Sequence, residues 1–174
     1  HQGEIASLCK ITQPDYGYIT NFGKAHLEGF GGVEGVIKGK SELYNYLIKN
    51  KKTIFINYDD EIQVEKSEGT DIISFSEGKN ATHQITFLKA DPFVKINTED
   101  TEINSQLIGT YNAKNIAAAI CIGKYFKIPV KAIKETIESY QPTNNRSQII
   151  NQNSNQIILD AYHANPTSMK AALE

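Results

Sequence analysis

The sequence lacks the features that mark a membrane, secreted or nucleic-acid-binding protein. No apolar run approaches the roughly 18 residues of a membrane-spanning helix, and the chain does not open with a signal peptide. Neither sign of charge predominates, since charged residues make up 22% of the chain and the formal net charge is −2. This balance provides no field that would attract a nucleic acid or a membrane surface. We therefore expect a soluble, cytoplasmic protein.

Cysteine is also scarce, with two residues in a chain of 174. Cys9 and Cys121 each lie in an apolar helical pattern, which favours buried thiols in a reducing compartment over a disulfide. The length is sufficient for one hydrophobic core, or for one domain and part of another.

A true phosphate-binding P-loop is missing too. The stretch Gly35–Ser41, GVIKGKS, looks like the motif G-x-x-x-x-G-K-[ST], but it has three residues between the glycines where the motif requires four. It also lies inside a helical pattern, where backbone N–H groups are not free to surround a phosphate. We reject it, and no other stretch fits.

The side chains best suited to catalysis or ligand binding lie in Ile19–Tyr44, ITNFGKAHLEGFGGVEGVIKGKSELY. The stretch opens as a strand end, because the preceding Tyr16–Ile19 is rich in β-formers. A glycine-rich loop follows and contains one histidine, His26, and one carboxylate, Glu28. From Val33 the apolar residues recur at spacings of three and four, which predicts a helix with one buried stripe.

Lys40 lies on that stripe. Its polar neighbours are expected on the wet face of the helix: Lys38, Ser41, Glu42 and Asn45. An ammonium group among apolar side chains is unfavourable, so the pKa of Lys40 should fall and the neutral amine should become a nucleophile. A neutral lysine can capture carbon dioxide as a carbamate, whose oxygens suit Mg²⁺. The alternative is that the side chain merely extends its charged end to water along an apolar stem.

The rest of the chain alternates strands and helices, which predicts an α/β fold with a mostly parallel sheet, flanking helices and a small antiparallel β patch. Strands are expected at 53–57, 72–75, 84–90, 93–97 and 102–108, and helices at 109–126 and 129–140. The run Asp59–Glu61 can be an acid–base pair, but we interpret it as the acidic start of a helix.

Two pairs of polar residues stand at positions where a ligand could bind. Asn112 and Asn115 are one helical turn apart and can present a donor and an acceptor to one ligand edge, although Asn112 alone could be a helix cap. After a polar turn at 141–145, Arg146 begins one strand, and Asp160 ends the next. An acid at the carboxyl end of a strand is the ligand-facing position of an open α/β fold, although it can also cap a loop.

These segments together resemble the Mur ligases, ATP-dependent amide-forming enzymes of peptidoglycan assembly. The resemblance is carried by four motifs in order: ITNFGKAHLEGFG with the lysine of KGKSELY fourteen residues after the histidine, YNAKNIAAA, NNRSQ, and LDAYHANPTSM. It spans nearly the whole chain. The last motif is similar to the one found in the branch of the family that adds D-alanyl-D-alanine to a UDP-N-acetylmuramoyl tripeptide.

The resemblance implies a domain division and a set of roles. Residues 1–145 would be a central ATPase domain without its P-loop, and 146–174 the beginning of a C-terminal Rossmann-like ligase domain. His26 and a carbamylated Lys40 would be catalytic and hold Mg²⁺. The nucleotide, ATP, would meet four residues: Asn112, Asn115, Arg146 and Asp160. The small-molecule substrates would react through an acyl phosphate, and we expect a monomer. Without a P-loop, the 174 residues alone are expected to be inactive.

Two positions depart from the family pattern, and two rival functions remain. Tyr111 stands where many relatives have histidine, and His163 where asparagine is commoner. One rival is a folylpolyglutamate-synthase-like amide ligase, against which A-N-P-T-S-M argues. The other is a non-catalytic scaffold, against which the retained Lys40, His26 and Asp160 argue. The third residue of the tripeptide is not determined by the sequence.

Overall fold

The computed structural model describes residues 1–23, 31–78, 80–142 and 148–159. The chain divides into two compact units, residues 1–83 and 84–174, and each is described by itself. The predicted domain boundary at 145/146 stays a prediction. No helix of the described residues is long and apolar enough to cross a membrane.

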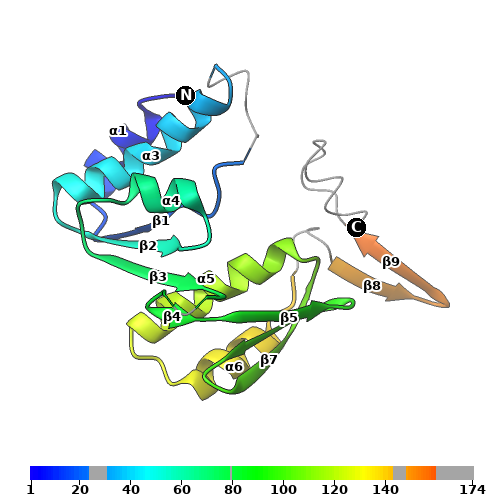
Figure 1. Ribbon diagram of the computed structural model, residues 1–174. Coiled ribbons are helices and arrows are strands. Elements are labelled where there is room, and N and C mark those ends of the chain that lie inside the picture. The colour runs from blue at the N-terminus through cyan, green and yellow to red at the C-terminus, as the bar shows by residue number, and fades with distance from the viewer. Residues whose placement is uncertain (24–30, 79, 143–147, 160–174) are drawn as a thin grey trace. The chain divides into compact units, whose positions relative to one another are not determined.

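The first unit is built on a parallel sheet (Figure 1). Its elements are α1 (Glu4–Thr12), β1 (Tyr16–Tyr18), α3 (Val33–Lys49), β2 (Thr53–Asn57), α4 (Glu61–Lys66), β3 (Ile72–Ser76) and β4 (His83–Gln84), the last of which reaches the unit boundary. The strand order is β1-β2-β3-β4, and the pairs β1/β2 and β2/β3 are parallel. The predicted strand at 53–57 and the predicted helix from Val33 are confirmed.

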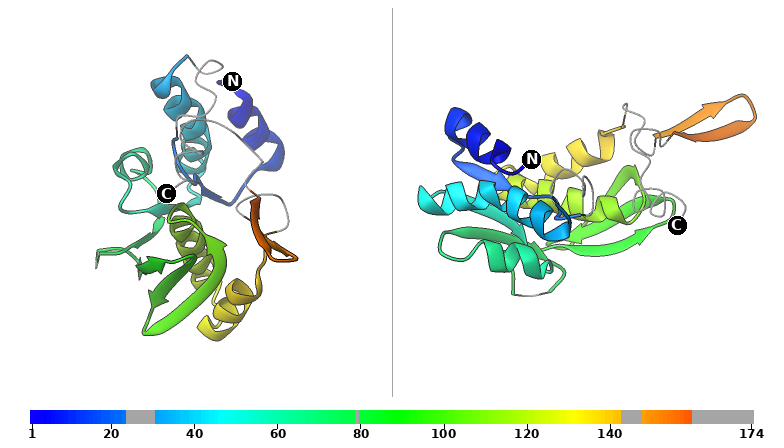
Figure 2. Two further views of the ribbon diagram at one scale, coloured as in Figure 1. Left: turned by 90° about the vertical axis from the view of Figure 1, so that its right-hand side faces the viewer. Right: turned by 90° about the horizontal axis from the view of Figure 1, so that it is seen from above.

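The core of the first unit forms where α3 and α4 pack on the sheet. Its buried members are Ile19, Phe22, Tyr44, Leu47, Ile54 and Ile56, and half-buried residues of α4 add to the cluster. Gly17 in β1 permits the close approach of α3, because a Cβ atom there would lie 2.5 Å from Cδ1 of the fully buried Leu47. The helix α1 lies beside α3 in each view (Figures 1 and 2). The packing therefore fixes α3 to the end of β1, where the stretch Ile19–Tyr44 begins.

The second unit contains an antiparallel sheet covered by two helices. Its elements are β5 (Thr86–Ala90), β6 (Phe93–Thr98), β7 (Thr101–Ile108), α5 (Tyr111–Tyr125) and α6 (Val130–Ser139). The strand order is β5-β6-β7, as expected for an antiparallel patch. Burial alternates along β6, with Val94 and Ile96 buried and the residues between them less so. One face of the sheet therefore packs under α5 and α6 (Figure 1).

A hairpin forms the last described segment. The strands β8 (Gln148–Gln152) and β9 (Asn155–Leu159) pair antiparallel, and Gln152 lies opposite Asn155. The turn therefore holds only two residues, and Asn153 has the positive φ of 55° that such tight turns use. Two strands were predicted here, one from Arg146 and one ending at Asp160, and the described parts of both are strands. Asp160, expected directly after β9, lies outside the described residues.

Candidate functional site

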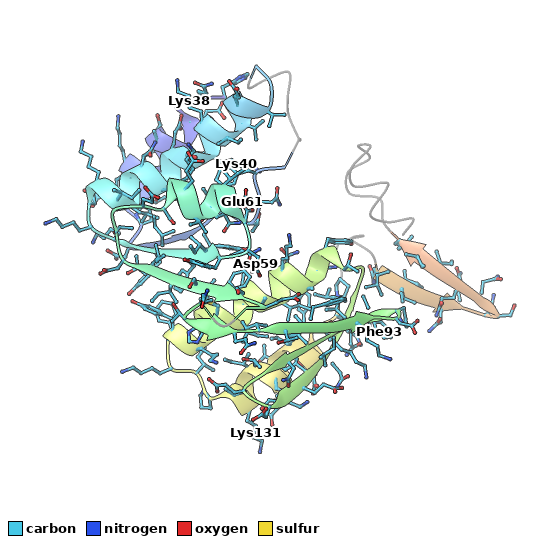
Figure 3. The ribbon with its side chains drawn as sticks, in the orientation of Figure 1. Lys38, Lys40, Asp59, Glu61, Phe93 and Lys131 are labelled. Carbon is cyan, nitrogen blue, oxygen red and sulfur yellow. The ribbon has the colours of Figure 1, made fainter. Side chains whose placement is uncertain are left out.

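The amine of Lys40 is held by the main chain that follows β1. Nζ of Lys40 donates a hydrogen bond to the carbonyl oxygen of Asn21 at 2.8 Å and approaches Asn21 Oδ1 at 3.5 Å. Lys40 is half-buried, and no carboxylate of the described residues forms an ion pair with it. Figure 3 labels this residue together with Lys38, which stands exposed on the same helix.

Burial lowers the pKa of Lys40 below its ordinary value. The predicted direction of the shift is therefore confirmed, and its cause is loss of hydration of the charged form. Lys52 in the same unit shows the opposite case: its hydrogen bond to the carboxylate of Asp15 raises its pKa. The amine of Lys40 instead meets the carbonyl and amide oxygens of Asn21. These neutral oxygens stabilise the ammonium form less than a carboxylate would.

The loop that supplies the carbonyl is itself fixed by the side chain of Asn21. Oδ1 of Asn21 accepts the backbone N–H of Gly23 at 2.9 Å, and Nδ2 donates to Oγ1 of Thr20 at 3.4 Å. A Cβ atom at residue 23 would lie 2.8 Å from Asn21 Oδ1, so a larger residue there would displace this amide. Asn21 was not predicted as a site residue, although an asparagine two residues before a glycine is a known turn pattern.

Tyr44 ties the same region to the sheet. Its side chain is fully buried, its hydroxyl donates to the carbonyl oxygen of Phe55 at 3.2 Å, and it accepts the N–H of Ile19 at 3.4 Å. Burial raises the pKa of Tyr44, so the phenol stays protonated and can donate. One hydroxyl of α3 thus joins β2 to the residues that lead to Asn21.

Two of the four residues expected on the wet face of α3 are not there. Ser41 is buried, and Glu42 is half-buried because its carboxylate accepts the N–H groups of Gly3 at 2.6 Å and Ala6 at 2.9 Å. The prediction was wrong because it considered only one partner for α3. The helix α1 covers a second face, and the Glu42 carboxylate satisfies two backbone groups at the start of α1.

The two asparagines of α5 interact with each other. Nδ2 of Asn112 donates to the carbonyl oxygen of Ile108 at 2.8 Å, and Nδ2 of Asn115 donates to Oδ1 of Asn112 at 3.2 Å. Thr110 is the N-cap residue of α5, so Asn112 does not have that role. Asn112 has 9% of its surface exposed, whereas Asn115 is exposed to solvent. The outer amide is therefore the one that a ligand can reach.

Three predicted site residues, His26, Arg146 and Asp160, lie outside the described residues. Within the part of the chain that the structure describes, no three histidine, cysteine, aspartate or glutamate side chains are close enough to hold a metal ion. The carboxylates at 59–61 have a structural role, since Asp60 Oδ1 accepts the N–H groups of Ile62 and Gln63 as the N-cap of α4. Both cysteines are buried free thiols, as predicted.

The class of protein to which the chain belongs is given by comparison with known families, and it is a class of ligases. The Mur ligase middle domain matches residues 1–123, and the chain belongs to this family. The predicted fold class, a Mur ligase central domain of mixed α/β structure, is confirmed.

Particular relatives are UDP-N-acetylmuramoyl-tripeptide--D-alanyl-D-alanine ligases. The chain is 30% identical to that of Bacillus subtilis over 99% of this chain and 38% of the relative. It is 31% identical to that of Rickettsia prowazekii over 100% of this chain and 41% of the relative. The chain thus spans about two fifths of the length of these relatives.

Solved structures agree in fold. A crystal structure of MurF from Acinetobacter baumannii has a TM-score of 0.82 and 28% identity, and covers 98% of this chain and 39% of that one. MurF ligase from Thermotoga maritima in complex with ADP has a TM-score of 0.83 and 22% identity, and covers 99% and 41%. At that identity the second likeness concerns the fold alone.

Proposed function

We propose that this chain is the central part of an ATP-dependent ligase that joins D-alanyl-D-alanine to a UDP-N-acetylmuramoyl tripeptide in peptidoglycan precursor synthesis. One observation carries the proposal. Relatives with that name match at least 98% of this chain, so the likeness continues beyond the family domain, which ends at residue 123. The segment after residue 123 includes LDAYHANPTSM, the motif that favours this branch of the family.

The proposed reaction has two steps. The γ-phosphoryl group of ATP passes to the terminal carboxylate of the tripeptide, which gives an acyl phosphate and ADP. The amine of D-alanyl-D-alanine then attacks the carbonyl carbon, phosphate leaves, and the amine loses a proton as the amide forms. Catalysis of phosphoryl transfer depends mainly on positioning and on stabilising charge. Rigidly held groups such as Lys40 suit this task better than mobile ones.

The first proposed role is that of Lys40 with His26 in holding Mg²⁺. An ammonium group would repel the cation, but the half-buried amine with its lowered pKa suits conversion to a carbamate, whose oxygens are hard ligands. The chain's own contribution is orientation, because the Asn21 carbonyl accepts an N–H from the amine and can still accept the single N–H of a carbamate. When bound, Mg²⁺ supplies positive charge to the phosphoryl oxygens.

The second proposed role is nucleotide binding by Asn115, Arg146 and Asp160, with Asn112 supporting Asn115 from the inner side of the pair. The MurF ligase of Thermotoga maritima was solved in complex with ADP, which supports a nucleotide as the ligand of this fold. The exposed amide of Asn115 offers hydrogen bonds for a base. Arg146 would neutralise phosphate charge, and Asp160 would accept hydrogen bonds from ribose hydroxyls. We further propose that the enzyme is a cytoplasmic monomer whose partners are these small molecules.

The test is product formation by the full-length protein. Purified protein is given ATP, Mg²⁺, the UDP-N-acetylmuramoyl tripeptide and D-alanyl-D-alanine, and the pentapeptide product is identified by mass spectrometry. We expect ADP release that requires both the tripeptide and the dipeptide. Tripeptides with different third residues are compared, because the sequence does not specify that residue. Activity with a folate and glutamate instead would favour the folylpolyglutamate-synthase-like alternative, and no turnover with either set would favour a scaffold.

A further inference from the structure

We propose that the groove between α3 and α4 is a ligand site separate from Lys40, and that it binds a short zwitterionic peptide with aliphatic side chains. The groove has a volume of about 400 Å³, which is within the range of small-molecule sites. Both helices belong to the first unit, and residues of each line the groove. Lys40 is not one of them, and its amine meets the carbonyl oxygen of Asn21. The inference therefore does not depend on the proposed ligase reaction.

A row of polar side chains on α3 forms one wall of the groove. It consists of Glu34, Lys38, Ser41 and Asn45, which follow one another at spacings of three and four and so share one face of the helix. None of these side chains forms a hydrogen bond or an ion pair with a residue that the structure describes. Their bonding groups are therefore available to a ligand.

Ser41 is the unusual member of this row, because the other three are exposed and can bind water. Ser41 has only 5% of its surface exposed, and its hydroxyl has no hydrogen-bond partner among the described residues. Folded proteins pair the large majority of such groups, because a buried hydroxyl has lost its bonds to water. A polar ligand in the groove would supply the missing partner.

The charges around the groove favour a ligand that carries both signs. Two lysines and two glutamates line it, so the lining has no net charge. Glu65 and Lys66 of α4 form an ion pair with each other at 2.6 Å, whereas Glu34 and Lys38 of α3 have no partner among the described residues. A purely anionic ligand at Lys38 would be repelled by Glu34 one turn away, and a cation at Glu34 by Lys38. A zwitterion is attracted by both.

The spacing of these two charges and the apolar part of the lining indicate a dipeptide. Glu34 and Lys38 are four residues apart, which is about 6 Å along the helix. Two residues of extended chain span about 7 Å, so the ammonium end can meet Glu34 while the carboxylate meets Lys38. Ser41, one turn beyond Lys38, can donate to the same carboxylate. The half-buried Ile37 and Ile62, one from each helix, offer apolar surface to aliphatic side chains.

Titration of the full-length protein with L-alanyl-L-leucine tests the proposal, with binding followed by amide NMR spectra. We expect a dissociation constant of about 1 mM, because each exposed charge contributes little. The amide signals that shift should be those of the residues that line the groove. Two derivatives probe the ends of the ligand. The N-acetyl derivative lacks the ammonium group, the C-terminal amide lacks the carboxylate, and each should bind about 2- to 5-fold more weakly.

Variants of the groove assign the contacts. Ser41→Ala should weaken dipeptide binding about 10-fold, and it should not lower the melting temperature of the free protein, where the hydroxyl has no partner to lose. Lys38→Ala should weaken binding of the dipeptide about 2- to 5-fold and leave binding of its C-terminal amide unchanged. Glu34→Ala should do the same for the dipeptide and its N-acetyl derivative. The matched control is Lys49→Ala, which removes an exposed lysine of α3 outside the groove and should bind as the wild type does.

Several outcomes would overturn the inference. Absence of shifts at the groove would exclude a dipeptide site there, and equal binding of both derivatives would reduce it to an apolar contact. Inorganic phosphate that shifted the same signals as strongly would make it an anion site. A lower melting temperature in free Ser41→Ala would show that the hydroxyl already has a partner. Product formation from the tripeptide is measured separately, so none of these results decides the proposed ligase reaction.

Discussion

In the first unit, the amine of Lys40 meets a carbonyl 19 residues earlier in the chain, whereas in the second unit Asn115 is held by a side chain three residues away. The lysine is therefore placed by tertiary packing: α3 must lie against β1 and β2 before Asn21 comes within reach. Asn115 is placed by Asn112, one turn earlier in α5, and Asn112 is placed by the carbonyl oxygen of Ile108. A loss of packing in the first unit should therefore displace Lys40, whereas the asparagine pair depends mainly on its own segment.

The largest expected effect is the loss of turnover when Lys40 is replaced. Lys40→Ala in the full-length ligase should lower turnover about 100- to 1,000-fold, the usual loss when a group that stabilises transition-state charge is removed. Added acetate should restore part of the activity by replacing the carbamate oxygens. The matched control is Lys38→Ala, which removes an exposed lysine from the same helix and should retain turnover. Undiminished turnover in Lys40→Ala would favour the alternative, in which the Lys40 side chain only extends its charged end to water.

The next effect tests the packing on which Lys40 depends. Tyr44→Phe leaves two buried backbone groups, of Ile19 and Phe55, without their hydroxyl partner, so the free energy of unfolding should fall by about 1 to 3 kcal/mol. The measurement is urea denaturation. Hydrogen exchange should also accelerate at the N–H of Ile19.

Tyr46→Phe is the control for that change. It removes the same hydroxyl from the same helix, where the group makes no hydrogen bond with any described residue. The unfolding free energy should stay within about 0.5 kcal/mol of the wild type. If both phenylalanine variants lost equal stability, the two hydrogen bonds of the Tyr44 hydroxyl would have no special role.

Loss of a local contact in the first unit should lower the free energy of unfolding by less. Asp60→Ala removes the side chain that caps α4 and should lower the free energy of unfolding by about 1 kcal/mol. Glu61→Ala removes the neighbouring exposed carboxylate and should have little effect, as measured by thermal unfolding of both variants. A larger loss for Glu61 would contradict the interpretation of this acidic run as a capped helix start.

The smallest effect is a difference in reactivity between two lysines. Because the pKa of Lys40 is lowered from 10.5 and that of Lys52 is raised, amine labelling followed by mass spectrometry should show Lys40 reacting at lower pH than Lys52. The unfolded state binds the Lys40 proton more tightly, so this residue opposes folding at neutral pH, and the opposition fades as the pH rises through both pKa values. Asp15→Asn should bring the reactivity of Lys52 toward that of an ordinary lysine. Equal labelling midpoints for Lys40 and Lys52 would contradict the burial effect.

The parts that could be predicted from the sequence are those that depend on near neighbours. The apolar spacing predicted α3, the β-rich run at 53–57 predicted β2, and the acidic run predicted the start of α4. The pairing of the two asparagines of α5 also follows from their one-turn separation. In each case the interacting residues lie within a few positions, so one segment contains the required information.

The parts that escaped prediction depend on distant partners. The contact between Lys40 and Asn21 requires α3 to dock on β1, and the role of Glu42 requires α1 to lie across α3. Periodicity identifies a buried stripe but does not say how many elements cover a helix, which is why Ser41 and Glu42 were misplaced. The roles of His26, Arg146 and Asp160 stay predictions, since those residues lie outside the described part of the chain.

Residues 40–44 give α3 three separate tasks within little more than one turn. Lys40 supplies the amine, Glu42 holds the start of α1, and Tyr44 ties β2 to the residue that follows β1. Lys40 and Tyr44 lie four residues apart on one face of the helix and Glu42 lies on another, so their relative angles matter as much as their identities. A single-residue insertion between Lys40 and Tyr44 would turn one end of the segment about 100° against the other. In a library of length variants, this turn should therefore be among the places least able to accept an insertion or a deletion.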